Sequence, residues 1–78
     1  MDLYEKINRN PRNVTPKELI ELLENYGFEY KNTKGDHALY KRPGDRRFPV
    51  PISQKPLAIH IVKKALKIIR DIRELEQD

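Results

Sequence analysis

Apolar residues recur at helical spacing directly after a helix-start signal in the first third of the chain. Thr15 precedes Pro16, and Glu18 follows three positions after the threonine, which is the arrangement of a capping box with proline at the first helical position. An apolar face then follows at positions 19, 20, 22, 23 and 26. Gly27 stands where a left-handed residue would end the helix. The pattern predicts a helix from about Pro16 to Tyr26.

A second helical pattern runs from about Pro56 to Glu76. One apolar stripe continues along its whole length, and a second stripe lies beside it only as far as Ile69. A broad apolar face is typical of a helix that packs on a sheet, so the last turns would extend past the core. They would either offer Ile72 and Leu75 to another chain, with self-association through this helix, or fold back on the amino-terminal arm.

Between the two helices, the period of the apolar residues changes to the alternation of strands. Three stretches show it: residues 28–31, 37–41 and 46–52. Turn sequences separate them at residues 34–36 (Lys-Gly-Asp) and 43–45 (Pro-Gly-Asp). Because proline has no N–H to donate, the prolines on both sides of Val50 predict that the third strand is short, irregular or at a sheet edge. The pattern predicts three antiparallel strands.

Helix, three strands and helix define a single α+β domain over residues 1–78. Residues 14–78 form the expected core, with both helices on one face of the sheet and the other face open. Residues 1–13 are expected to form an amino-terminal arm or a short helix, because Leu3, Tyr4 and Ile7 have helical spacing.

Composition limits the functions open to such a domain. Hydrophobic residues make up 37% and charged residues 36%, so the chain is rich in charge but has enough apolar periodicity to fold. The absence of cysteine excludes disulfides and thiolate-bound metals and is compatible with a reducing compartment. The chain has no apolar run of the length of a membrane span or signal peptide, so a cytoplasmic location is expected.

Positive charge is concentrated in the middle of the chain. Residues 31–70 contain eleven basic and two acidic side chains, a net charge of +9, whereas the remaining positions together carry −5. Such a segment favours a face that binds a polyanion, because neutralising phosphates releases counterions. The alternative is a charged surface that only keeps a small protein soluble.

Several short motifs, in their order and spacing, resemble the HicA family of toxins. They are the capped-helix run at residues 14–20, Gly27-Phe28, and residues 34–40, where Lys-Gly-Asp-His leads into a strand; residues 10–14 and 62–67 also fit. The resemblance covers most of residues 10–69. It implies an α-β-β-β-α fold similar to that of double-stranded-RNA-binding domains. It also implies a metal-independent endoribonuclease that cleaves messenger RNA, needs no cofactor and is silenced by a HicB-type antitoxin.

The same resemblance implies that His37 is the catalytic residue, because it matches the histidine of the family's Gly-Ser-His motif. Asp36 stands where the family has serine; a carboxylate there would favour the charged form of the imidazole but would also repel phosphate. RNA supplies its own nucleophile, the 2′-hydroxyl, so cleavage needs mainly a proton acceptor, a proton donor and cations. Imidazole can take either proton role at neutral pH. Without the motif, a histidine at a strand start is more typical of an ordinary surface residue.

Other residues near His37 are candidates for holding RNA. Gly35 would let a phosphate approach the backbone, and Tyr40 would stack on a base or relay a proton, unless it is simply a core aromatic. The candidate cations are on the same strands and turns: Lys34, Lys41, Arg42, Arg46 and Arg47. Alternation leaves the register open, so either His37 and Leu39 or Ala38 and Tyr40 point inward.

His60 lies between isoleucines on the long helix, which favours partial burial by packing, or an RNA contact, over catalysis. Two other functions stay open: a noncatalytic RNA-binding module of the same fold, and an interaction subunit whose long helix docks a partner. Metal- and nucleotide-dependent enzymes find no support, because the sequence has neither a phosphate-binding glycine loop nor a His-Glu-x-x-His motif.

Overall fold

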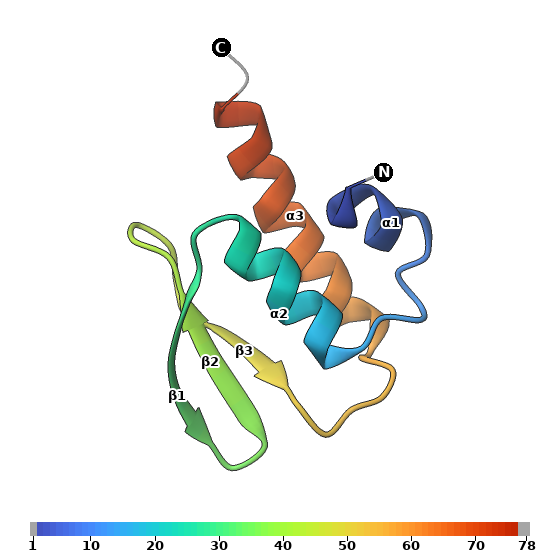
Figure 1. Ribbon diagram of the computed structural model, residues 1–78, viewed down its shortest axis with the longest axis vertical. Coiled ribbons are helices and arrows are strands. Elements are labelled where there is room, and N and C mark those ends of the chain that lie inside the picture. The colour runs from blue at the N-terminus through green and yellow to red at the C-terminus, as the bar shows by residue number, and fades with distance from the viewer. Residues whose placement is uncertain (1, 77–78) are drawn as a thin grey trace.

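The computed structural model describes residues 2–76, which form six elements. In chain order these are α1 (Leu3–Arg9), α2 (Pro16–Asn25), β1 (Glu29–Lys34), β2 (His37–Lys41), β3 (Phe48–Pro51) and α3 (Ile59–Leu75) (Figure 1). The strands form one antiparallel sheet in the order β1-β2-β3. The predicted α+β fold of helix, three strands and helix is confirmed, and α1 precedes it as a short helix. Within residues 2–76, every helix is too short or too polar to span a bilayer.

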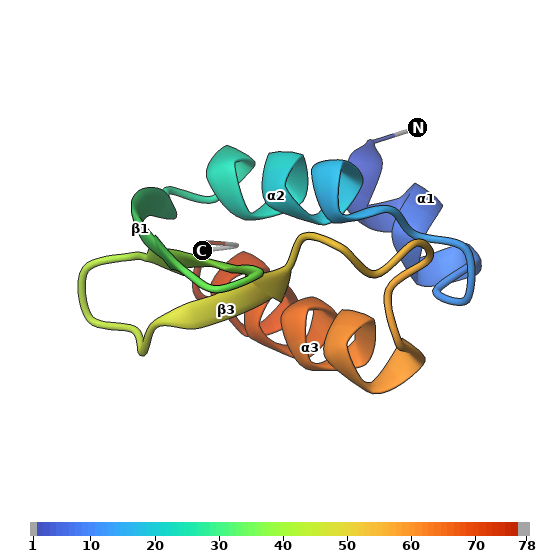
Figure 2. The same ribbon diagram turned by 90° about the horizontal axis from the view of Figure 1, so that it is seen from below.

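One face of the sheet is buried. Ala38 and Tyr40 of β2 and Phe48 and Val50 of β3 belong to the same core cluster as the apolar residues of α2 and α3. In the end view of Figure 2, α2 and α3 lie on either side of the core, with the sheet beside them and β3 toward α3. The alternate residues of β2, starting with His37, lie on the opposite face. The register that the sequence left open therefore has Ala38 and Tyr40 pointing inward.

β3 is four residues long and lies at an edge of the sheet, as its prolines predicted. Pro49 is opposite Leu39, and Pro51 is opposite His37. In an antiparallel pair, only alternate residues direct their backbone groups at the partner strand. Because proline has no N–H to donate, the backbone groups that face β2 belong to the alternate residues, Phe48 and Val50. The backbone groups of both prolines face away from the sheet.

The start of α3 differs from the sequence prediction. The helix begins at Ile59, three residues after Pro56. The backbone N–H of Leu57 donates to the carbonyl of Val14 (2.8 Å), and that of Ala58 donates to the Gln54 side chain (3.1 Å). These bonds fix residues 54–58 as a loop that is tied to the segment before α2. The strands also differ in extent, since β1 continues to residue 34 and β3 begins only at residue 48.

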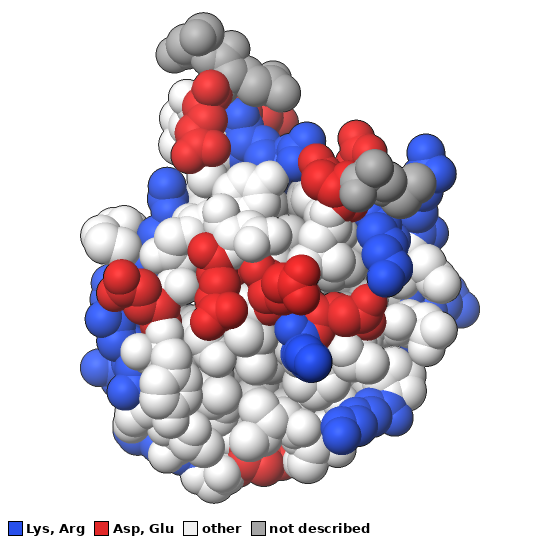
Figure 3. Space-filling view, viewed as in Figure 1, with Lys and Arg blue, Asp and Glu red and all other residues white. Residues whose placement is uncertain are grey.

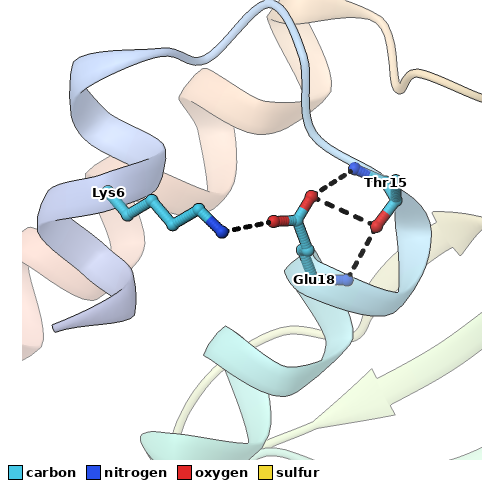
Figure 4. A network of polar contacts seen from close by, with 3 residues as sticks. All are labelled: Lys6, Thr15 and Glu18. Atoms are coloured by element: carbon cyan, nitrogen blue, oxygen red, sulfur yellow. Dashed lines mark hydrogen bonds and ion pairs between the residues drawn. The ribbon is translucent and has the colours of Figure 1, made fainter.

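α2 begins with the predicted capping box. The Thr15 hydroxyl accepts the backbone N–H of Glu18 (3.2 Å), and the Glu18 carboxylate accepts the backbone N–H of Thr15 (3.1 Å) (Figure 4). The Lys6 ammonium of α1 lies 3.3 Å from the other oxygen of that carboxylate. The Thr15 N–H, and then Lys6, lower the pKa of Glu18. One carboxylate thus closes the start of α2 and links it to α1.

α1 is packed against the rest of the domain. Ile7 is only 2% exposed and belongs to the core. From α3, Arg73 donates to the hydroxyl of Tyr26 (2.8 Å) and to the carboxylate of Asp2 (3.3 Å), and its guanidinium lies 4.4 Å from the centre of the Tyr4 ring. The amino-terminal segment is therefore a docked helix that covers the last turns of α3.

This docking decides between the two fates expected for the end of α3. Ile72 is buried in the core and so is not available to another chain. Leu75 is 80% exposed. α3 packs against the amino-terminal segment as far as Ile72. Its last turn presents the apolar side chain of Leu75 to solvent.

Candidate functional site

His37 is the first residue of β2 and stands on the open face of the sheet. Its side chain is 49% exposed, and its strand neighbours are Lys34 of β1 and Pro51 of β3. The turn before it passes through Gly35, whose φ of 58° lies in the left-handed region that favours glycine. A Cβ built on Gly35 would meet nothing within 4 Å, so the space above the turn is open. Lys34, Gly35 and His37 thus lie together, as predicted.

Asp36 orients the His37 ring. One oxygen of the Asp36 carboxylate lies 2.9 Å from His37 Nδ1, and the other accepts a hydrogen bond from the Ser53 hydroxyl (2.7 Å). The backbone N–H of Ile52 also donates to the Asp36 carbonyl (2.8 Å), which holds the segment after β3 against this turn. With Nδ1 bonded to the carboxylate, Nε2 is the ring nitrogen left for proton exchange with a ligand.

The Asp36 carboxyl stays ionised in this setting. The Ser53 hydroxyl is the main cause of its lowered pKa, followed by its own backbone N–H and by His37. A carboxylate that fixes the tautomer and orientation of a histidine is a recurring arrangement in acid–base sites. No sequence motif predicted a role for Ser53, which lies 17 residues after Asp36; the one clue was the unusual aspartate beside the histidine.

A shallow pocket of about 190 Å³ lies beside His37, between β3 and α3. Its lining includes His37, His60, Lys64 and both prolines of β3. His60 and Lys64 are one turn apart on α3, so they lie on the same side of the helix. Both are exposed, so the expected partial burial of His60 is wrong. The pocket brings together the two histidines of the chain, one from β2 and one from α3.

A second pocket, of about 270 Å³, continues from the first along the same side of the molecule. It is lined by Arg46, Arg47 and again Lys64, whose ammonium lies 6.0 Å from the centre of the Phe48 ring. We call the two pockets together the β3–α3 groove, lined among others by His37, His60, Lys64, Arg46 and Arg47. Lys64 lines both pockets, whereas Arg46 and Arg47 lie at the end of the groove beside the β2–β3 turn, away from His37.

Two of the predicted cations are engaged elsewhere. The Lys41 ammonium donates to the backbone carbonyl of Asp45 (2.9 Å), and the Arg42 guanidinium lies 3.2 Å from the Asp45 carboxylate. Both side chains are half-buried, at the end of β2 away from His37. Four residue steps along a strand cover about 13 Å. The structure thus assigns Lys41 and Arg42 to the β2–β3 turn and not to the surroundings of His37.

Tyr40 lies on the inward face of the sheet and is 7% exposed. Its ring packs edge-on against Tyr30, with 5.7 Å between the ring centres. Burial raises the pKa of its hydroxyl, which makes it a poorer proton donor. The expectation that Tyr40 stacks on a base or relays a proton is therefore corrected: it is a core residue.

Charge is divided between the two sides of the domain. In the view of Figure 3, a band of acidic side chains crosses the molecule over α2, which carries Glu18, Glu21 and Glu24. The exposed side of α3 carries basic residues instead: Lys63, Lys64, Lys67 and Arg70. A polyanion is repelled from the α2 side and attracted to the side that holds the β3–α3 groove.

Within residues 2–76, histidine and carboxylate side chains nowhere gather in a group of three that could hold a metal ion. The site holds an exposed imidazole bound to a carboxylate beside cations, a combination that can bind a phosphate group.

The chain is thus a small basic α+β domain with a groove that is lined by cations and holds two histidines. The sequence model described as "HicA toxin of bacterial toxin-antitoxin" matches residues 16–70, which is more than half of the chain. The chain therefore belongs to the HicA toxin family, whose members pair with an antitoxin in toxin–antitoxin systems. No curated protein and no solved structure matches the chain closely enough to add to this assignment. The matched residues include all of the β3–α3 groove but not α1.

Proposed function

We propose that this toxin is an endoribonuclease that cleaves messenger RNA without a metal, with His37 in proton transfer. The observation that carries the proposal is the Asp36-bound, half-exposed imidazole at the end of a groove lined by Lys64, Arg46 and Arg47. The 2′-hydroxyl oxygen attacks the adjacent phosphorus, and the bond from phosphorus to the 5′-oxygen breaks. The 2′-hydroxyl proton goes to a base, and the 5′-oxygen receives a proton from an acid. The products are a 2′,3′-cyclic phosphate and a 5′-hydroxyl.

Each part of the groove has a role in this reaction. Asp36 holds His37 in the tautomer whose Nε2 can accept the proton of the 2′-hydroxyl. The Lys64 ammonium, which shares the pocket with His37, stabilises the negative charge that grows on the phosphate in the transition state, and Arg46 and Arg47 hold phosphates farther along the RNA. Gly35 leaves the approach to His37 open, and Lys34 adds a further positive charge. The partner that silences the toxin is proposed to be a HicB-type antitoxin.

The test is cleavage of single-stranded RNA by the purified protein in EDTA. We expect wild type to cleave and His37→Ala to lose cleavage by about 10²–10⁴-fold, the usual size of a general acid–base contribution. The far-UV spectrum and the RNA affinity of His37→Ala should stay those of wild type, and Lys17→Ala, an exposed residue on α2, should cleave normally. Cleavage that persists in His37→Ala refutes the mechanism. Induced expression in cells should be toxic for wild type and harmless for His37→Ala.

RNA binding provides a separate test of the groove. Replacing Arg46 and Arg47 by alanine should weaken RNA binding and reduce its dependence on salt, since each lost phosphate contact lowers the salt slope by about one. Arg12→Ala, an exposed arginine outside the groove, serves as the matched control and should bind as wild type does. RNA binding by wild type without any cleavage would favour the alternative function, a noncatalytic RNA-binding module of the same fold.

A further inference from the structure

His60 is exposed, and it lines the same pocket as His37. It stands in the first turn of α3, 23 positions after His37, and the fold alone brings the two residues to one cavity. A pocket of about 190 Å³ has room for several water molecules at about 30 Å³ each, and hence for a phosphate group.

One imidazole does not complete the proposed reaction. In a single displacement, the base that takes the 2′-hydroxyl proton and the acid that protonates the 5′-oxygen act on opposite sides of the phosphorus. His37 has one ring nitrogen bound to Asp36, so only Nε2 is left for proton transfer. It can accept the proton of the nucleophile but cannot give another to the leaving oxygen in the same step. A second proton-transfer group is required.

The pocket offers two side chains for that role, because its other lining residues are Phe48, Ile61 and prolines. One is Lys64, but an ammonium group gives up its proton less readily than an imidazolium near neutral pH and serves better as a fixed positive charge. The other is His60. The titratable side chains that line its pocket with it are His37 and Lys64.

We propose that His60 is the general acid of this site and that His37 is the base; the inference rests on the proposed ribonuclease function. The 2′-hydroxyl gives its proton to His37 Nε2, its oxygen bonds to phosphorus, the bond to the 5′-oxygen breaks, and that oxygen takes a proton from the His60 imidazolium. Proton exchange with water restores both rings. Lys64, one turn beyond His60, neutralises the phosphate during the step.

The test compares His60→Ala and His60→Gln with His37→Ala on two substrates. The first is an RNA oligomer whose cleavage position has been mapped with wild type. The second is the same oligomer with sulfur in place of the 5′-bridging oxygen at that position, because a thiolate leaves without being protonated. On ordinary RNA, both His60 variants should cleave about 10²–10⁴-fold more slowly than wild type. On the sulfur substrate, they should cleave within a few-fold of wild type, whereas His37→Ala should stay slow on both.

The outcomes separate this inference from the proposed function. Wild-type cleavage that requires His37 but proceeds at a normal rate in the His60 variants overturns the role of His60 and leaves the proposed function intact. A His60 defect of equal size on both substrates also overturns it, because the residue would then position or bind RNA. Failure of wild type to cleave either substrate refutes the proposed function itself. Unchanged melting temperatures and RNA affinities of the His60 variants exclude misfolding and lost binding as causes.

Discussion

Replacing Ile7 by alanine tests whether α1 is an integral part of the fold, although it lies outside the residues that match the family. Ile7 is 2% exposed in the core. The substitution removes three carbon atoms, which corresponds to about 2.4 kcal/mol of transfer free energy at about 0.8 kcal/mol each. The cavity left behind adds to this, so we expect a loss of about 3 kcal/mol, within the range of about 2–5 kcal/mol for such changes.

That loss is large for a domain of this size. At about 0.05–0.15 kcal/mol per residue, a chain of 78 residues has a free energy of unfolding of about 4–12 kcal/mol. A loss of about 3 kcal/mol should lower the melting temperature by about 12–24 °C. Thermal unfolding followed by far-UV circular dichroism measures the shift, and urea unfolding measures the free energy directly.

Leu75→Ala is the matched control, because this side chain is also aliphatic but is 80% exposed. It should change the free energy of unfolding by less than about 0.5 kcal/mol. If Ile7→Ala is as harmless as Leu75→Ala, then α1 is not docked in solution, and the contacts of Arg73 with the amino-terminal segment do not contribute to stability.

Three further predictions concern polar contacts. Thr15→Ala should lower the free energy of unfolding by about 1 kcal/mol through loss of the N-cap, and Thr15→Ser should restore most of it in urea unfolding. Glu18 has a folded-state pKa below its ordinary value of 4.5, so its carboxylate stabilises the fold above that pH, and the stabilisation is lost as the pH falls through the lowered pKa. Glu18→Gln should therefore be less stable than wild type at neutral pH and equally stable in acid; a difference that persists in acid contradicts this assignment. Ser53→Ala should raise the pKa of Asp36 toward its ordinary value, as measured by NMR titration of the carboxyl carbon, and an unchanged pKa would show that the Ser53 bond is not formed.

The parts of the fold that the sequence predicted correctly depend on local spacing. The capping box at Thr15 joins residues three apart, and β2 has the predicted bounds because turns enclose an alternating stretch on both sides. The start of α3 was predicted too early because the Leu57 N–H bonds to Val14, 43 residues away, and no periodicity reports such a contact. The register of β2 was open for the same reason, since alternation does not say which face meets the helices.

In the candidate site, too, the sequence could place the residues that are close along the chain but not those that the fold brings together. His37, Gly35 and Lys34 are neighbours in sequence, and the turn keeps them together. The roles of Ser53 and His60 depend on pairing between distant segments, so the sequence alone could not assign them. The prediction that Tyr40 stacks on a base was wrong, because stacking required the opposite register of β2. In the structure its ring points inward and is buried in the core.

The two prolines of β3 have a consequence for the way another chain can bind. The backbone positions of β3 that face outward are Pro49 and Pro51, so this edge of the sheet offers carbonyl acceptors but no N–H donors. A strand from a second molecule cannot form a regular ladder there, and sheet extension is restricted to the β1 edge. Any protein that blocks the β3–α3 groove must therefore do so without extending the sheet at β3.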